Sequence, residues 1–152
     1  MKIEVREISS LKPYENNPRI NDPAVEAVAN SIKEFGFRQP VVVDAEGTII
    51  AGHTRVKAAA RLGMTTVPVH VADELTPAQA RLYRLADNKT NELAEWDTTK
   101  LLAEIQGLDG LESLGFTADE LAALDIPNDN TAIDEDAMKD TENECPKCGF
   151  KW

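Results

Sequence analysis

Apolar side chains recur with two different periods along the first ninety residues, and this change of period predicts strands alternating with helices. Short apolar runs bounded by turn residues are typical of strands that are at least half buried. A tight turn joins the second run to the third and makes them a hairpin. The predicted strands are residues 3–8, 40–44, 48–52 and 66–71.

Two of these strands carry further information about their place in a sheet. Ile3, Val5 and Ile8 recur with nearly alternate spacing, so we expect them to face the same way. Pro68 indicates that the last strand lies at an edge, because proline has no N–H to donate to a second neighbour. His70 alternates outward and is expected to be an ordinary strand residue.

A helical period and recognisable start signals predict five helices. Asn21 or Asp22 caps the first helix, with Pro23 at its first position. Its apolar stripe consists of Val25, Val28, Ile32 and Phe35. Three later helices begin after capping residues, which are Thr76, Asp97 and Thr117. The predicted helices are residues 23–35, 54–62, 77–90, 97–108 and 117–125.

Charge divides the 152-residue chain into parts with different properties. Residues 1–91 carry 12 Lys and Arg against 11 Asp and Glu, whereas residues 92–152 carry 4 against 16. Nucleic-acid binding depends on neutralising phosphates, so the second part is unsuited to direct DNA contact. We therefore expect an α+β domain at 1–91, a short helical extension at 92–124, an acidic linker at 125–144 and a separate tail at 145–152.

The tail contains both cysteines of the chain, Cys145 and Cys148, in a C-x-x-C motif typical of a zinc knuckle. Zinc needs four ligands, so the missing pair would come from a second copy of the chain, which would make a homodimer, or from a partner protein. The alternative is a reduced thiol pair without metal. No stretch of 18 consecutive apolar residues is present, and the start lacks the apolar region of a signal peptide. We expect a cytoplasmic protein with no membrane contact.

The stretch "IIAGHTRVKAAARLG", residues 49–63, joins a predicted strand to a predicted helix through Gly52. The first turn of a helix presents unpaired N–H groups that attract anions, and glycine permits close approach of a ligand. His53, Thr54, Arg55 and Lys57 follow, and all can contact an anion. This arrangement is consistent with a phosphate-binding turn, although a glycine turn with solvated polar residues would have the same pattern.

An ordered series of motifs surrounds this junction: "SIKEFG", "RQPVVV", "AGHTRVKAAARLG", "TTVPVHV" and "LADNKTNE". The series resembles the N-terminal domain of the ParB/sulfiredoxin superfamily over roughly residues 3–92. In particular it resembles the ParB-like (ParB-like nuclease) domains of phage and prophage regions and of DNA methyltransferase fusions. The resemblance implies a small mixed sheet with flanking helices, and the handling of CTP or ATP with Mg²⁺.

Carried over by position, the resemblance also implies roles for individual residues. Residues 52–55, with Lys57 and Arg19, would contact phosphates, and Asn88 would help to hold Mg²⁺. Asp87 and Glu26 would be the catalytic carboxylates. Each has a plainer alternative: Asp87 and Asn88 could end a helix, while Glu26 and Arg19 could be solvated surface residues.

Two departures from the family pattern weaken the expected phosphate affinity. Thr54 stands where the family has an arginine, and no arginine follows "DN" in "DNKTN". Sulfinic acid reductase activity is excluded, because glycine occupies position 52 where sulfiredoxin has its cysteine.

Three functions follow from these observations. The first is a nucleotide-dependent module in DNA modification, transcription or partition, with NTPase or phosphotransferase activity left open. The second is a non-catalytic adaptor that recruits a DNA methyltransferase or nuclease through its acidic second half. The third is a DNA nuclease, which the lack of a basic stripe disfavours. In the first two, DNA is reached through a protein partner.

Overall fold

The computed structural model describes residues 2–124, so the predictions for the acidic linker and for Cys145 and Cys148 lie outside the described residues. Four strands form one mixed sheet in the order β1-β4-β2-β3. The strands are β1 (Ile3–Glu7), β2 (Val41–Val43), β3 (Ile49–Ala51) and β4 (Thr66–Val71). The parallel pair is β2 with β4, and the other two pairs are antiparallel. The predicted α+β class with a small mixed sheet is therefore confirmed.

Five α-helices accompany the sheet within the described residues: α1 (Val25–Phe35), α2 (His53–Arg61), α3 (Pro77–Asn91), α4 (Thr98–Ile105) and α5 (Ala118–Ala123). Three short 3-10 turns are η1 (Ile8–Ser10), η2 (Asp22–Ala24) and η3 (Leu111–Leu114). Thr76, Asp97 and Thr117 cap their helices through side-chain oxygens, as predicted. Among these helices none is long and apolar enough to cross a membrane.

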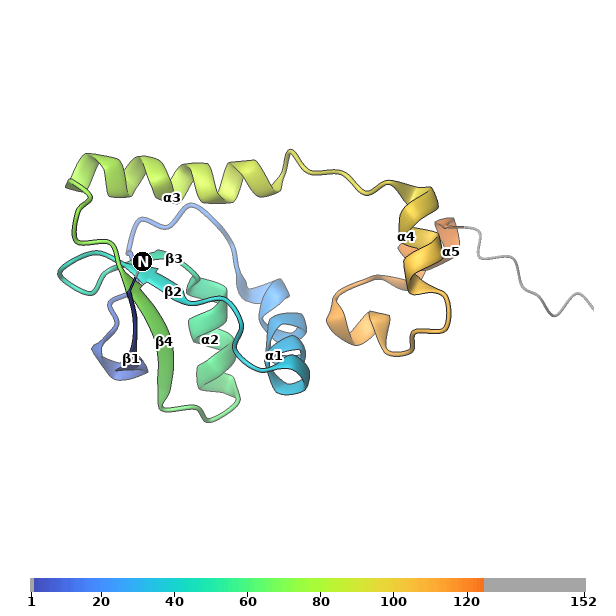
Figure 1. Cartoon of the computed structure of the whole chain (residues 1–152), viewed down its shortest axis with the longest axis horizontal. Helices are drawn as coiled ribbons and strands as arrows, with labels where there is room; N and C mark the ends of the chain where they lie inside the picture. Colours follow the sequence, from blue (N-terminus) through green and yellow to red (C-terminus); the bar gives the residue numbers. More distant parts are fainter. Residues whose placement is uncertain (1, 125–152) are drawn as a thin grey trace, which may run out of the picture.

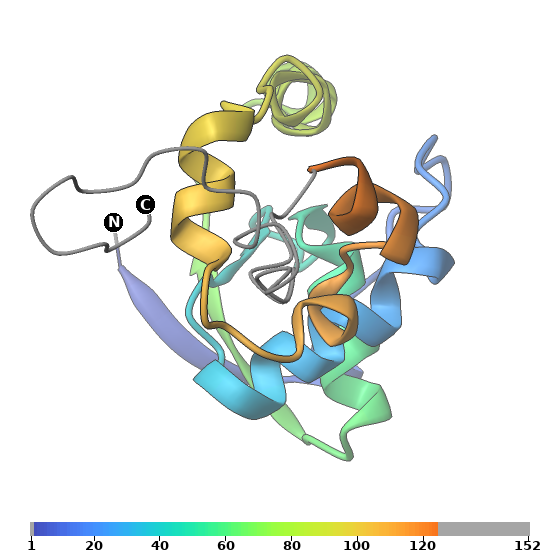
Figure 2. The same ribbon diagram turned by 90° about the vertical axis from the view of Figure 1, so that its right-hand side faces the viewer.

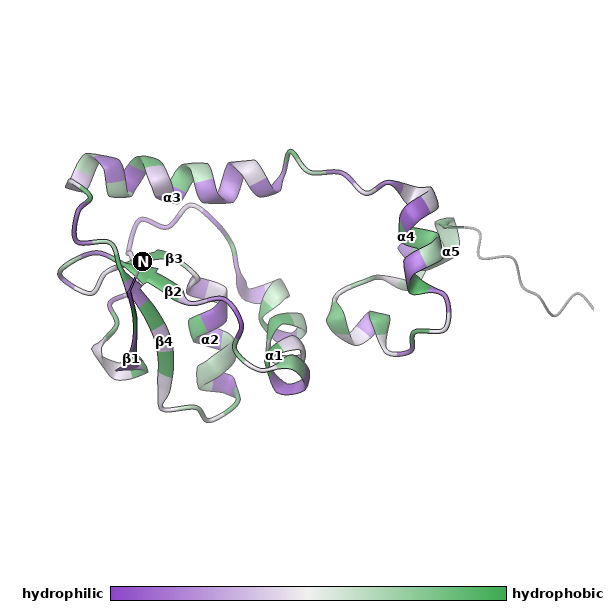
Figure 3. Cartoon of the chain, viewed as in Figure 1, coloured by the Kyte–Doolittle hydropathy of each residue, from purple (hydrophilic) through white to green (hydrophobic). Residues whose placement is uncertain are grey.

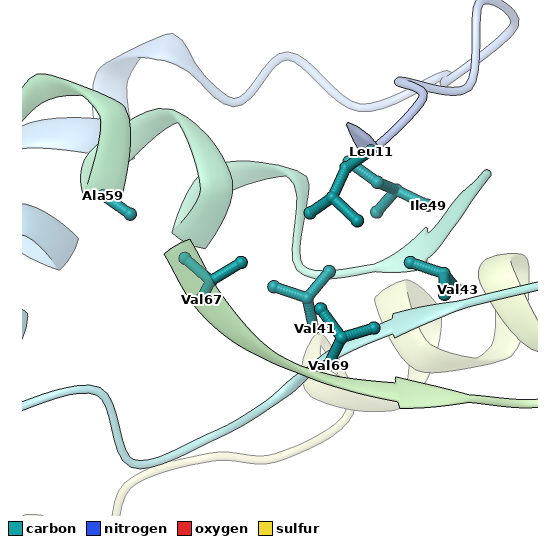
Figure 4. Packing of buried hydrophobic residues seen from close by; sticks show 7 residues of the cluster. All are labelled: Leu11, Val41, Val43, Ile49, Ala59, Val67 and Val69. Atoms are coloured by element: carbon teal, nitrogen blue, oxygen red, sulfur yellow. The ribbon is translucent and has the colours of Figure 1, made fainter. Parts of the chain in front are cut away.

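The main hydrophobic core lies between the sheet and α2, as Figure 4 shows. Alternate residues of a strand point to opposite faces, so Ile49 contributes to this core while Ile50 contributes to the other face. There Ile50 packs with Ala80 of α3. Figure 1 shows α3 along one side of the sheet and α2 on the other. The main core consists of Leu11, Val41, Val43, Ile49, Ala59, Val67 and Val69.

A second layer forms where α1 packs on α2 through small side chains. Val25 and Ala29 of α1 lie against Ala58 of α2, which is fully buried. Phe35, the last residue of α1, lies past this contact and is 46% exposed. Val28 and Ile32 of the predicted stripe pack against the cluster, whereas Phe35 at the end of the stripe stays outside it. The alanines of "VKAAARLG" allow the two helices to approach closely.

Two predictions about the strands are also wrong. Pro68 lies in β4, which has neighbours on both sides, and not at an edge. The arrangement is tolerated because β2 begins opposite Val69, so Pro68 lies outside that ladder. Ile3 and Val5 do not join Ile8 in the core but are 53% and 72% exposed. They pair with His70 and Pro68 on the face opposite α2. On that face the cluster beneath α3 consists of Ile50, Ala72 and Ala80, with Val42 and Leu75 packed against it, and it does not include Ile3 or Val5.

The segment after α3 folds back on the first part of the chain. The side-chain amide of Asn30 in α1 donates to the carbonyl oxygen of Ser113 at 2.8 Å. Gly115 lies so close to α1 that an added Cβ would meet Ala27 at 3.3 Å. Figure 2 shows η3 crossing over α1, and Figure 3 shows hydrophobic and hydrophilic positions intermixed along α3.

The core makes a direct prediction about stability. Ile49→Val removes one methylene from a side chain that is 1% exposed, and it should lower the free energy of unfolding by about 1 kcal/mol. Ile3→Val makes the same chemical change at an exposed site and should cost less than about 0.5 kcal/mol. Urea denaturation measures both, and equal losses in the two variants would contradict this assignment of the core.

Candidate functional site

The strand-to-helix junction has the predicted geometry. Gly52 directly follows β3 and is the N-cap of α2. Its backbone φ is 103°, an angle that residues other than glycine rarely adopt. An added Cβ would lie 3.4 Å from Cα of Val41 and 3.5 Å from the guanidinium of Arg55. The chain therefore leaves the sheet and starts a helix within one residue, which places the N-terminus of α2 at the end of β3.

A cavity of about 310 Å³ opens at this N-terminus. Three segments that are distant in sequence meet around it: the loop before α1, the β3–α2 junction and the last turns of α3. Of the predicted site residues, it is lined by Gly52, His53, Thr54, Arg55, Asp87, Asn88 and Arg19. The structure thus brings most of the predicted set together.

Glu26 and Lys57 do not line this cavity. Lys57 pairs with Asp22 at 2.7 Å, and the carboxylate of Glu26 lies 3.7 Å from the guanidinium of Arg61. Asp87 is the only carboxylate among the lining residues. Asp87 and Asn88 lie inside α3, which continues to Asn91, so the alternative that they end the helix is wrong.

Arg55 is held at the floor of the cavity by backbone acceptors. Its Nη1 donates to the carbonyl oxygens of Gln39 at 2.9 Å and of Pro40 at 2.8 Å. Burial lowers the pKa of Arg55, and the nearby Asp87 opposes this shift. The guanidinium remains a cation at neutral pH. The same residue faces a second, neighbouring cavity of about 540 Å³.

His53 is held as a neutral ring by its surroundings. The backbone N–H of Tyr14 donates to His53 Nε2 at 3.3 Å, so this nitrogen acts as an acceptor. Burial lowers the pKa of His53 below 6.5, and the charges of Arg84 and Lys57 add to the effect. The other ring nitrogen, Nδ1, then carries the proton.

Arg19 joins the loop before α1 to the end of α3. Its Nη1 donates to the backbone carbonyl of Asn88 at 3.3 Å and lies 3.4 Å from the carboxylate of Glu92. The Asn88 amide donates its own N–H to the carbonyl of Arg84 at 2.9 Å, which leaves its oxygen for a ligand. Asn88 is therefore oriented by its own helix.

Several residues at the site were not predicted from the sequence. Asn17, Asn21 and Asn91 line the cavity with side-chain amides. Asn17 and Asn21 lie in a turn-rich loop, where asparagine is common for local reasons. Arg84 and Tyr14 are distant in the sequence, and only the fold brings them together. The Arg84 guanidinium lies 3.6 Å from the centre of the Tyr14 ring.

Within residues 2–124, no group of three or more His, Cys, Asp or Glu side chains is placed to hold a metal ion by itself. Asp87 and Asn88 nevertheless offer oxygen donors side by side on α3. Mg²⁺ is usually held by one or two carboxylates together with water and the phosphates of a ligand. The residues present therefore fit Mg²⁺ that arrives with a phosphate ligand.

Comparison with known proteins gives a consistent result. Residues 1–95 match the family model of the ParB N-terminal domain. The chain is 45% identical over 80 residues to the ParB-like nuclease domain-containing protein YnaK of Escherichia coli, covering 52% of this chain and 92% of that protein. It is 40% identical over 111 residues to a probable plasmid-partitioning protein ParB of Thermus thermophilus, covering 70% of this chain but 36% of that protein.

A solved structure is similar over most of the described chain. It is the C-terminally truncated chromosome-partitioning protein ParB from Caulobacter crescentus, complexed with CTP-gamma-S. The TM-score is 0.60 at 25% sequence identity, and the match covers 82% of this chain and 71% of that one.

The neutral state of His53 predicts a pH dependence of stability. Because folding lowers the pKa of His53, the neutral ring contributes fully to the free energy of unfolding above pH 6.5. This contribution is lost as the pH falls through the lowered pKa. The free energy of unfolding should therefore decline more steeply as the pH falls below 6.5 in the natural chain than in His53→Asn. Denaturation at a series of pH values measures this difference. His70→Asn is the control and should keep the decline, and a decline that persists unchanged in His53→Asn would contradict the assignment.

Proposed function

We propose, because this chain belongs to the family of ParB N-terminal domains, that it binds a nucleoside triphosphate with Mg²⁺. The observation that carries the proposal is the cavity at the N-terminus of α2, faced by Asp87 and Asn88 of α3. The ParB structure with a TM-score of 0.60 is of a protein complexed with CTP-gamma-S. A triphosphate in this chain would lie against the β3–α2 junction.

The proposed phosphate contacts come from backbone and side chains together. The first turn of α2 supplies N–H groups with no intrahelical partner, and the helix dipole favours an anion at this end. His53 Nδ1–H and the Thr54 hydroxyl are neutral donors, while Arg19 and Arg55 add positive charge. Thr54 replaces an arginine of the family pattern, so more of the binding rests on Arg19 and on the helix.

The proposed metal contacts lie on α3. The carboxylate of Asp87 and the side-chain oxygen of Asn88 would complete the ligands of Mg²⁺ together with phosphate oxygens and water. Mg²⁺ supplies charge neutralisation of the phosphates when it is bound. Asp87 is also the candidate for a general base, because it is the only carboxylate lining the cavity.

The neighbouring cavity of about 540 Å³ offers a place for the nucleoside. It shares Arg55 and Asp87 with the phosphate cavity, so one ligand can extend from one into the other. Val42 and Leu75 give it apolar walls, and Tyr83 is 41% exposed at its side. An aromatic ring in this position can stack on a base.

We place this activity in DNA metabolism, through a protein partner such as a DNA methyltransferase, in phage or prophage DNA modification or as an accessory of transcription or partition. The similarity to partitioning proteins supports the broader role. Residues 92–152 carry 4 Lys and Arg against 16 Asp and Glu, which favours a protein partner over direct DNA contact in that part.

A second candidate function is a non-catalytic adaptor. Apolar side chains of α3 and the segment after it are exposed: Leu82 by 67%, Leu85 by 54% and Leu93 by 71%. Thr54 in place of an arginine also favours this candidate, because it removes one phosphate contact. An adaptor would recruit its partner equally well with and without nucleotide.

The nuclease alternative is tested by nicking of plasmid DNA, which Asp87→Ala should abolish.

Calorimetric titration with CTP, ATP and ADP, each with Mg²⁺, tests the proposed site. Arg19→Ala removes an exposed arginine that lines the cavity, and it should weaken nucleotide binding about tenfold, as expected for the loss of a hydrogen bond to a charged group. The variant should fold normally because Arg19 is exposed.

Arg61→Ala is the matched control for this titration. It removes the same charge from the exposed end of α2, outside the cavity, and should change the affinity by less than about twofold. Failure of all three nucleotides to bind the natural chain would overturn the proposed function. Equal weakening of nucleotide binding in Arg19→Ala and Arg61→Ala would mean that only the net charge matters, and it would contradict the proposed contact of Arg19 with the nucleotide.

A further inference from the structure

Arg84 is the only charged residue among the described residues that is buried, with 4% of its surface exposed. Its Nη2 donates to the backbone carbonyl of Ile49 at 3.3 Å, and its Nε has no hydrogen-bond partner among the described residues. Burying an arginine with an unsatisfied donor costs free energy. Ordinary attachment of α3 to the sheet would not require a buried charge, because Ala80 and Ile50 already provide an apolar contact.

The guanidinium of Arg84 stacks on Tyr14, at 3.6 Å from the centre of the ring. This contact is a cation–π interaction between α3 and the loop that precedes α1. The same loop carries Asn17 and Arg19, which line the cavity. Arg84 therefore holds a loop that contributes directly to the candidate site, although Arg84 itself is not among the residues lining it.

The next link runs from Tyr14 to His53. The backbone N–H of Tyr14 donates to His53 Nε2 at 3.3 Å, which requires that Nε2 carry no proton. A neutral histidine of this kind has its proton on Nδ1, and Nδ1 is then the ring nitrogen left for a ligand. His53 lines the cavity at the first position of α2.

The charges around His53 act in the same direction. Arg84 from α3 and Lys57 from α2 both disfavour a second proton on the ring, and Lys57 is itself paired with Asp22 of η2. The loop contributes the uncharged ring and backbone of Tyr14. These contacts keep the ring neutral and its tautomer fixed.

We propose that Arg84 is a positioning residue for the phosphate site. By stacking on Tyr14 it holds the Tyr14 N–H against Nε2 of His53, and so fixes His53 as an Nδ1–H donor toward the bound phosphate. This inference rests on the proposed nucleotide site, but the link from Arg84 to the tautomer of His53 exists without a ligand and can be measured without one.

The experiment uses two readouts on the full chain. Nitrogen-15 NMR of the histidine side chains reports the tautomer and the titration of His53, and His70→Gln assigns the signals because the chain has 2 histidines. In the natural chain His53 should be the Nδ1–H tautomer. Arg84→Met should allow His53 to populate both tautomers and should raise its titration midpoint. It should also weaken binding of CTP with Mg²⁺ about three- to tenfold.

Two further variants make the test specific. Arg81→Met removes the same charge one turn earlier on α3, at an exposed position, and should change neither readout. Tyr14→Ala keeps the backbone N–H but removes the ring on which Arg84 stacks, so it should release the tautomer as Arg84→Met does. It also provides the test if Arg84→Met does not fold.

The proposal would be overturned if His53 kept the Nδ1–H tautomer in Tyr14→Ala, or if the natural chain showed the Nε2–H tautomer. A released tautomer with unchanged nucleotide affinity would also overturn it, since positioning would then have no effect on the ligand. If the tautomer responds as expected but no nucleotide binds even the natural chain, it is the proposed function that has failed.

Discussion

The arrangement of this molecule depends on the single-residue passage from β3 into α2 at Gly52. β3 is fully buried, and the next residue must both end the strand and cap a helix, which the backbone achieves with a φ of 103°. Because of this sharp passage, the unpaired N–H groups of α2 emerge at the end of β3 and not at a distance from the sheet. The loop before α1 and the end of α3 then need only to approach this point to enclose a cavity.

Polar contacts carry much of the attachment of α3 to the rest of the domain. Ala80 is its main buried apolar residue, whereas Arg84, Asn88 and, directly after the helix, Glu92 meet the loop or sheet through charged or polar groups. Hydrogen bonds weaken steeply when their geometry changes. The position of Asp87 and Asn88 is thereby coupled to the loop that carries Arg19, and a ligand between them would touch both.

The sequence predicted the features that depend on neighbouring residues. Thr76 identifies its helix through local capping, and Gly52 reveals the junction because a glycine between a strand and a helix has a local cause. The sequence could not predict which strand residues are buried, because their burial depends on helices and strands that are distant in the sequence. Pro68 and Val5 were misplaced because their surroundings depend on which strand pairs with β4 and on how far α3 extends over the sheet.

The site shows the same division. Residues 52–55 form a continuous motif, so their grouping was predictable from the chain alone. Arg84, in contrast, lies in a helix with many polar residues, where a surface position would be the ordinary expectation. Its partners in the fold are Ile49 and Tyr14, and Tyr14 is 70 positions away in the sequence. In the proposed site one ligand joins the β3–α2 junction to α3. Backbone amide chemical shifts recorded during titration with CTP and Mg²⁺ detect such a ligand, and amides at 52–55 and 87–91 should shift together along one binding curve. Shifts confined to α4 and α5, or absent from the junction, would show that the nucleotide does not join these two elements.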